Sequence, residues 1–117
     1  MSFKFEKLKV WQKAVDLSSV VSELNKTFPK DELFVLLAQI KRAADSVSLN
    51  IAEGSTGQSN PEFKKFLGYA LRSDIEGVGC LYLAQRRKII DEQSFTQIYA
   101  QCEVILVMIN ALRNSLE

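Results

Sequence analysis

The sequence predicts an all-α protein, an antiparallel up-down-up-down four-helix bundle that forms a single domain over residues 1–117. The chain has the length of one domain, and its 47% hydrophobic residues are enough to fill one core. Apolar residues recur at helical spacing in four long segments, and no stretch alternates apolar and polar residues for long enough to predict a strand. Segments of similar length joined by short connections favour antiparallel neighbours.

The first two helices are expected at residues 7–28 and 30–54, with Pro29 between them. In each segment the apolar residues lie three or four positions apart, which is typical of one buried helix face. In the first helix these residues are Val10, Ala14, Leu17, Val21, Leu24 and Phe28, and in the second they are Leu33, Leu36, Leu37, Ile40, Ala43, Ala44, Val47 and Ile51.

The third and fourth helices are expected at residues 61–88 and 92–115. Asn60-Pro61-Glu62 has the pattern of an N-cap, a first-turn proline and an acidic first turn, and Asp91-Glu92 marks the next start. Gly77 and Gly79 are expected to permit close approach of a neighbouring helix or a local kink. The apolar residues are Phe63, Phe66, Leu67, Ala70, Leu81 and Ala84, then Phe95, Ile98, Tyr99, Cys102, Ile105, Leu106, Ile109, Leu112 and Leu116.

The fourth helix has more apolar residues than one core needs. Beside its core stripe runs a second stripe, formed by Val104, Val107, Met108 and Ala111. A helix that is apolar around most of its circumference is buried on more than one side, so this stripe predicts a subunit interface. The alternative is a wide core face. The expected counterpart is the outer side of a neighbouring first or third helix, with Trp11, Val15 and Tyr82 as candidates.

A polar stripe borders the apolar face of the second helix. Its residues, at spacings of three or four, are Gln39, Arg42, Ser46, Asn50 and Glu53. The stripe predicts a hydrogen-bonded network between helices, with Arg42 buried and paired to Glu76 of the third helix. The alternative is a site for a polar ligand.

The composition excludes most enzyme classes. Without histidine the chain has no Ser-His-Asp or Cys-His catalysis and no His-containing zinc or di-iron site. Cys80 and Cys102 fit no metal-ligand spacing and are expected to be buried thiols. Asp74 and Glu76 point to different sides of a helix, so no carboxylate pair is expected. The sequence therefore predicts no catalytic residue, metal or cofactor, and a protein that is not an enzyme.

The expected location is the cytoplasm. No strictly apolar run is longer than six residues, the length of Val104 to Ile109, which is far shorter than the roughly 20 residues of a membrane span, so no membrane partner is expected. The charged N-terminal segment is unlike a signal peptide. Two cysteines without a disulfide pattern fit a reducing compartment.

Basic residues form small clusters in a chain whose net charge is only +1. The candidate nucleic-acid-binding residues are Lys9, Lys13, Lys41, Arg86, Arg87 and Lys88. The last three also lie where a helix C-terminus favours cations, which needs no ligand. Two functions stay open: an oligomeric adaptor that binds RNA, DNA or a nucleic-acid-processing protein, and an interaction or structural ring with no nucleic-acid role.

The second helix carries a resemblance to a known family. Residues 28–34, 39–47 and 50–54, read as FPKDELF, QIKRAADSV and NIAEG, resemble proteins encoded in intervening sequences of bacterial large-subunit ribosomal RNA genes. The opening Leu8 to Ala14 and several third-helix positions, Phe63, Phe66, Leu67, Ala70 and Ser73, are similar too. The polar stripe coincides with the family motif. The chain departs from the family pattern at Arg72 and at Gly77-Val78-Gly79.

This resemblance implies a four-helix bundle assembled as a homopentamer. It also implies a relationship to the accessory variability determinant of diversity-generating retroelements, a basic pentamer that binds reverse transcriptase and nucleic acid. The near-neutral charge of this chain and the absence of the arginine that follows the NIAEG motif in the family weaken the transfer of nucleic-acid binding.

Overall fold

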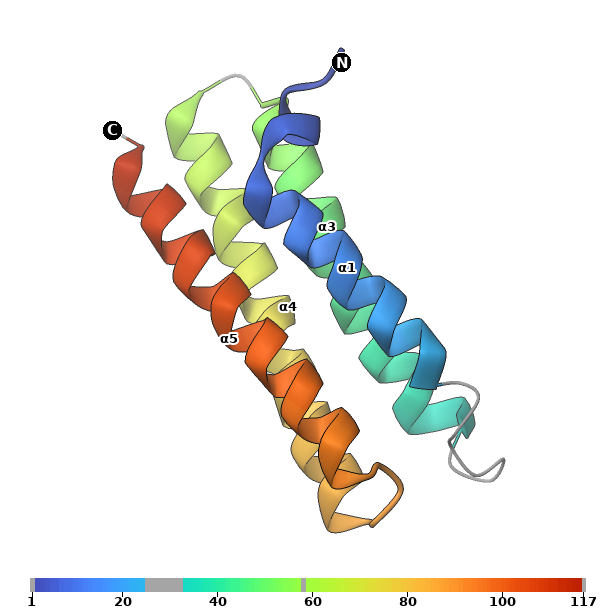
Figure 1. Cartoon of the computed structure of the whole chain (residues 1–117). Helices are drawn as coiled ribbons and strands as arrows, with labels where there is room; N and C mark the ends of the chain where they lie inside the picture. The colour runs from blue at the N-terminus through green and yellow to red at the C-terminus, as the bar shows by residue number, and fades with distance from the viewer. Residues whose placement is uncertain (1, 25–32, 58, 117) are drawn as a thin grey trace.

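The computed structural model describes residues 2–24, 33–57 and 59–116, and in these ranges all regular structure is helical. After a short 3₁₀ turn, η1 (Lys4–Lys7), come α1 (Lys9–Glu23), the π-helical turn η3 (Leu33–Leu37), α3 (Ala38–Ser55), α4 (Asn60–Arg86) and α5 (Glu92–Ser115). The four long helices alternate in direction along a bundle of 44 × 24 × 20 Å (Figure 1). Both α1 and α4 pack against α3 and α5. The predicted all-α up-down bundle is confirmed.

The helix ends follow local sequence signals. The side chain of Ser59, one residue before the predicted Asn60, accepts a hydrogen bond from the backbone N–H of Glu62 at 3.3 Å and caps α4. Asp91 caps α5 as predicted, accepting from the N–H of Ser94 at 2.6 Å. At the end of α4, Lys88 has φ 60°, and the N–H of Ile89 donates to the carbonyl of Ala84 at 3.0 Å. This is the left-handed helix stop that usually carries glycine.

The predicted bounds of α5 are confirmed, and those of α4 are correct to within two residues. The expectations for Pro29 and for residues 25–32 lie outside the described residues. The start of the chain differs from the prediction, because the helix expected from residue 7 begins at Lys9, after η1.

The core consists of the predicted apolar stripes. Its largest fully buried apolar side chains come from all four long helices and from η3: Leu17, Val21, Leu36, Ile40, Val47, Ile51, Leu67, Leu81, Ile98, Ile105 and Ile109. Leu106, predicted in the core, is only half-buried. One carboxylic acid, Asp74, is buried among these apolar residues.

The close helix approach lies at Gly54 and not at Gly77 or Gly79. A Cβ on Gly54 would stand 2.5 Å from the Cβ of Phe66 on α4, whereas a Cβ on Gly77 or Gly79 would meet nothing within 4 Å. The expectation of a close neighbour at the α4 glycines is therefore wrong. Residue 54 is where α3 and α4 need the smallest side chain.

Alanine substitutions at these glycines are expected to have opposite effects. Gly54→Ala forces α3 away from α4, because a Cβ attached to backbone has little room to move, and costs ~1–3 kcal/mol of unfolding free energy. The matched control Gly77→Ala gains helix propensity without a clash and stabilises by ~0.5–1 kcal/mol. Urea unfolding of both variants measures this, and equal effects would contradict the assigned approach.

Candidate functional site

Part of the predicted polar stripe joins α3 to α4. The side chain of Asn50 donates to the hydroxyl of Ser46 at 2.9 Å and to its carbonyl at 2.8 Å. The hydroxyl of Ser73 on α4 donates to the hydroxyl of Ser46 at 2.9 Å. Ser46 and Asn50 therefore lie in an interhelix network as predicted, and Ser73 completes it. Short side chains that satisfy one another at a seam fix the register of the two helices.

The remaining members of the predicted network do not join it. Arg42 and Glu76 are both exposed, and no ion pair links them. Both lie close to Cys80, since burial raises the pKa of its thiol, Glu76 adds to that rise and Arg42 opposes it. Glu53 is exposed, and Gln39 is half-buried outside the hydrogen-bonded group. The predicted buried Arg42–Glu76 pair is wrong, because long side chains at the edge of a helix seam extend into water.

Ser46→Ala is expected to destabilise the bundle by ~1 kcal/mol, because it removes the acceptor shared by Asn50 and Ser73. Ser48→Ala is the matched control, since the Ser48 hydroxyl bonds only to the carbonyl of Asp45 within its own helix. Thermal unfolding should show a lower melting temperature for Ser46→Ala alone. Identical melting temperatures would contradict a structural role for the network.

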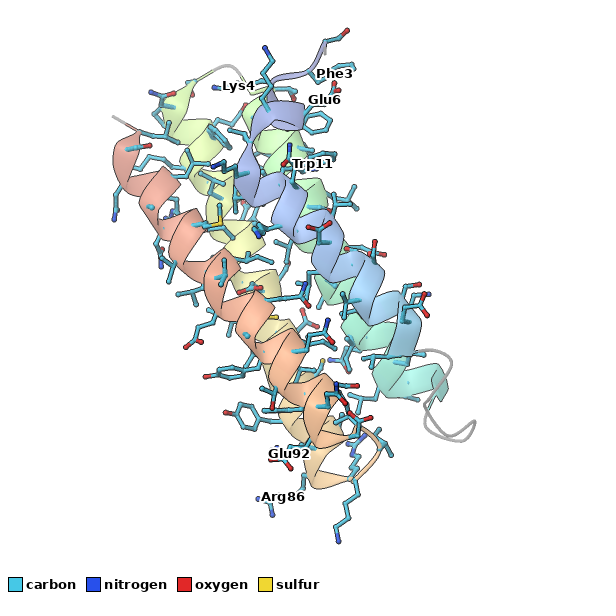
Figure 2. All side chains as sticks on the ribbon, in the orientation of Figure 1. Phe3, Lys4, Glu6, Trp11, Arg86 and Glu92 are labelled. Atoms are coloured by element: carbon cyan, nitrogen blue, oxygen red, sulfur yellow. The ribbon has the colours of Figure 1, made fainter. Side chains whose placement is uncertain are left out.

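The predicted basic residues do not form one surface on the bundle. Arg86 lies at the end of the bundle opposite Lys4 and Trp11, the latter being between Lys9 and Lys13 in α1 (Figure 2). Lys9, Lys13 and Arg86 to Lys88 are exposed, and Lys41 is half-buried. The bundle thus has basic side chains at separate places along its length.

The second apolar stripe of α5 is largely exposed. Val104 and Val107 are 47% and 62% exposed, and Ala111 is exposed too. Met108 differs from the prediction, since it is half-buried and packs against the core. By length and apolar composition α5 is also the one helix, among the residues that were described, that meets the criterion for a membrane span. Its inward side chains Ile98, Ile105 and Ile109 are buried against the other helices.

Trp11, a predicted counterpart of that stripe, is only partly exposed. It is half-buried against the core, and its ring packs edge-on against Phe5 with centroids 4.9 Å apart. Tyr82 and Val15 are exposed as predicted. Further exposed apolar side chains, which the sequence analysis did not single out, lie on η3 (Val35), α3 (Leu49) and α4 (Ile75 and Leu83).

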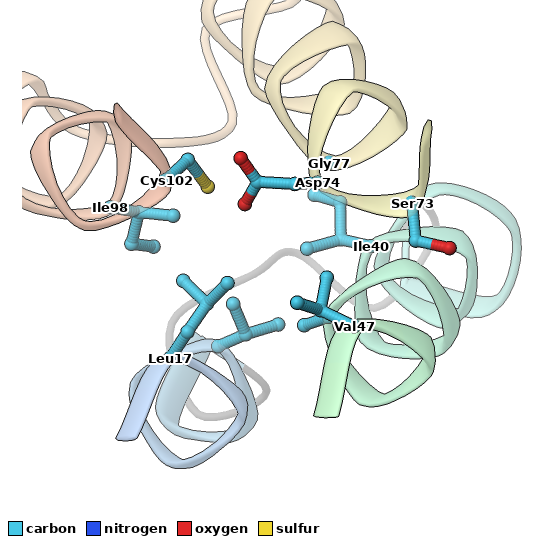
Figure 3. Close-up of a pocket in the computed structure, with 10 residues that line it drawn as sticks. Leu17, Ile40, Val47, Ser73, Asp74, Gly77, Ile98 and Cys102 are labelled. Atoms are coloured by element: carbon cyan, nitrogen blue, oxygen red, sulfur yellow. The ribbon is translucent and has the colours of Figure 1, made fainter. Parts of the chain in front are cut away.

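The carboxyl group of Asp74 points from α4 toward Cys102 on α5, inside the bundle (Figure 3). Asp74 is 1% exposed, and neither carboxyl oxygen has a hydrogen-bond partner. Burial raises the pKa of Asp74 to about 7, and the facing Cys102 thiol, a weak hydrogen-bond donor, acts in the opposite direction. Burial and the neighbouring Asp74 in turn raise the pKa of the Cys102 thiol. The pairing of these two side chains was not predicted from the sequence.

The Asp74–Cys102 pair is poorly suited to catalysis. A thiol whose pKa is raised is a weak nucleophile, and a carboxyl sealed from solvent has no substrate to accept a proton from. Among the described residues no three His, Cys, Asp or Glu side chains are grouped as metal ligands. The chemistry open to this pair is the gain or loss of a proton, which changes the charge inside the protein.

The sequence and the structure point to the same relatives. The sequence model of the 23S rRNA-intervening sequence protein family matches residues 6–111. Among solved structures, the chain is similar to a protein of unknown function from the S23 ribosomal protein family of Bacteroides thetaiotaomicron VPI-5482, with 25% identity and a TM-score of 0.83 over 89% of this chain and 97% of that one. No curated protein matches the chain in sequence. The chain belongs to the 23S rRNA-intervening sequence protein family.

Proposed function

We propose that this protein is a non-enzymatic helical-bundle adaptor that assembles with copies of itself and presents repeated basic side chains to RNA, DNA or a nucleic-acid-processing protein. The observation that carries the proposal is the exposed apolar stripe on α5, with Val104 and Val107 at its centre. Soluble monomers rarely expose contiguous apolar patches beyond a few hundred Å². We therefore expect the surface of another protein chain to cover this stripe.

A ring is the form of assembly we favour. Apolar side chains are exposed on α5 and also on α3 and α4, so the surface that meets α5 can be a different one. Contacts between unlike surfaces close into a ring when the rotation fits. The family resemblance suggests five subunits. We place the assembly in the cytoplasm, where the free Cys80 and Cys102 would stay reduced.

Assembly would also give the basic residues a role. The protomer has a net charge of +1, and its basic side chains lie at separate places, so one copy offers little to a phosphate backbone. A ring repeats Lys9, Lys13 and Arg86 around an axis. The alternative function is a ring that binds only proteins, which the same apolar surfaces support.

Binding measured at several salt concentrations separates these two functions. For a nucleic-acid adaptor, log affinity for single-stranded RNA falls with log salt, with a slope of roughly −0.7 per phosphate neutralised. The variant Lys9→Ala/Lys13→Ala should make that slope shallower, whereas Lys64→Ala/Lys65→Ala, on α4, serves as a charge-matched control. If the assembled protein does not bind RNA even at low salt, the ring that binds only proteins remains as the function.

A further inference from the structure

Asp74 separates two spaces in the bundle. On the inner side is a core cavity of about 10 Å³, lined by residues from all four long helices. On the outer side is a groove of about 250 Å³ between α4 and α5, lined by Asp74, Ile75, Val78, Tyr99, Cys102, Glu103 and Leu106. A side chain that lines both spaces lies at the α4–α5 seam itself.

No positive charge faces the carboxyl group of Asp74 from the elements that line these two spaces. Toward the cavity, α1 contributes Leu17 and Val21, and α3 contributes Ile40, Ala44 and Val47, none of which titrates. The titratable groups that α5 contributes are Cys102, Tyr99 and Glu103, which are neutral or negative. An ionised carboxylate at this position would therefore be buried with no cation facing it and with the weak S–H donor of Cys102 beside it, which is a costly state for a protein.

Packing beside Asp74 is loose on α4. A Cβ on Gly77, which lines the core cavity, would meet nothing within 4 Å. On the other seam of α4, Phe66 lies against Gly54, and Ser73 is hydrogen-bonded to Ser46. If water is to reach Asp74, α4 separates more readily from α5 than from α3.

We propose that Asp74 is a proton-operated latch on the α4–α5 seam, which stays closed while the carboxyl is protonated and opens along the outer groove when it ionises, so that water reaches Cys102. This inference goes beyond the proposed adaptor function and does not depend on it. Closing and opening move one proton between the carboxyl and solvent, and no other reactant takes part.

The direction and size of the effect follow from proton linkage. The pKa of Asp74 is about 7 when the seam is closed and returns toward 3.8 when water reaches it, so the closed state binds more protons between these values. Opening is therefore favoured as pH rises from about 4 to about 7 and changes little above that range. Between about pH 5.5 and about pH 8, ionisation should raise the opening equilibrium on the order of 30-fold.

The reactivity of Cys102 toward a thiol reagent tests the latch. We would measure alkylation of Cys102 in the full chain carrying Cys80→Ala, with and without Asp74→Asn, at about pH 5.5 and about pH 8. Comparison at equal pH removes most of the effect of thiol ionisation. From about pH 5.5 to about pH 8, the ratio of the Cys102 alkylation rate with Asp74 to the rate with Asp74→Asn should rise on the order of 30-fold. A negative charge at Asp74 suppresses the thiolate, so a faster rate with Asp74 cannot come from ionisation of Cys102.

Cys80 is the matched control reporter. It is buried on the side of α4 near Arg42, and it is measured in the same way in a Cys102→Ala background. For Cys80, the ratio of the alkylation rate with Asp74 to the rate with Asp74→Asn should stay constant with pH. An equal rise at both cysteines means global unfolding and overturns the latch, as does a flat ratio at Cys102. Asp74→Ala, which is also neutral, must reproduce the result of Asp74→Asn.

Discussion

Asp74→Asn should make the protein more stable than the wild type at about pH 8, by roughly 4 kcal/mol of unfolding free energy. The wild-type carboxyl at that pH is ionised in the unfolded chain but resists ionisation in the bundle, where both oxygens lack partners. Asparagine has nearly the same shape and carries no charge. A gain of that size is a large part of the 5–15 kcal/mol that holds a typical domain together.

The sign of this effect reverses the usual behaviour of an aspartate. The pKa of Asp74 is raised on folding from 3.8 to about 7, so the folded state holds more protons, and stability falls as pH rises from about 4 to about 7. The two proteins should therefore differ little near pH 4 and diverge as pH rises. Since other carboxylates titrate in the same range, urea unfolding is compared between the variant and the wild type at each pH.

Asp45→Asn is the control for this comparison, because Asp45 is an exposed aspartate on α3. It should change the unfolding free energy by no more than about 0.5 kcal/mol at any pH. A constant difference between Asp74→Asn and the wild type from pH 4 to pH 8 would show that the carboxyl at position 74 stays accessible to water.

The sequence does contain a signal for Asp74 that the analysis did not use. Asp74 follows Ala70 by four residues and precedes Leu81 by seven, so it lies on the apolar face of α4 and interrupts it. In the third predicted helix, helical spacing was considered for apolar residues only, and Asp74 was compared with Glu76 alone. A polar residue at the helical spacing of a buried apolar stripe predicts a buried polar group. The position of Cys102 opposite it depends on how the helices pack, which the sequence does not specify.

The polar stripe of α3 was predicted correctly for its short side chains and wrongly for its long ones. Helical spacing placed Ser46 and Asn50 at a seam, and short side chains can only bond to what lies next to them. Arg42 has the same spacing, but its long side chain reaches past the seam into water. Spacing alone gives the direction of a Cα–Cβ bond and not the place where a flexible side chain ends.

The predicted interface residues likewise fall into exposed ones and partly buried ones, for a similar reason. Val104 and Val107 follow directly from the excess of apolar residues on α5, and both are exposed on the protomer. Trp11 is less exposed than an interface residue is expected to be, because the turn η1, which was not predicted, brings Phe5 against the indole ring. The exposure of such an aromatic residue depends on a few neighbouring residues, and the sequence gives little indication of how those residues fold.

Val107→Glu is expected to dissociate the assembly into folded protomers. Val107 is 62% exposed on α5, so the protomer loses almost no core packing when it is replaced. At an interface, the same glutamate would be a buried and unpaired charge, whose cost far exceeds the free energy of one apolar contact. Light scattering should show the mass of one protomer, and circular dichroism should show unchanged helix content.

The control Gln97→Glu makes the same charge change on an exposed residue of the same helix, about 15 Å away along its axis. It should leave the assembly intact. Since α5 is also apolar enough to meet the criterion for a membrane span, lipid is the competing occupant of this face. A wild-type protein that is monomeric in buffer but binds neutral phosphatidylcholine vesicles would assign the face to lipid. Persistence of the oligomer in Val107→Glu would place the subunit contact on another face, and the exposed Leu49 and Ile75 are the next positions to substitute.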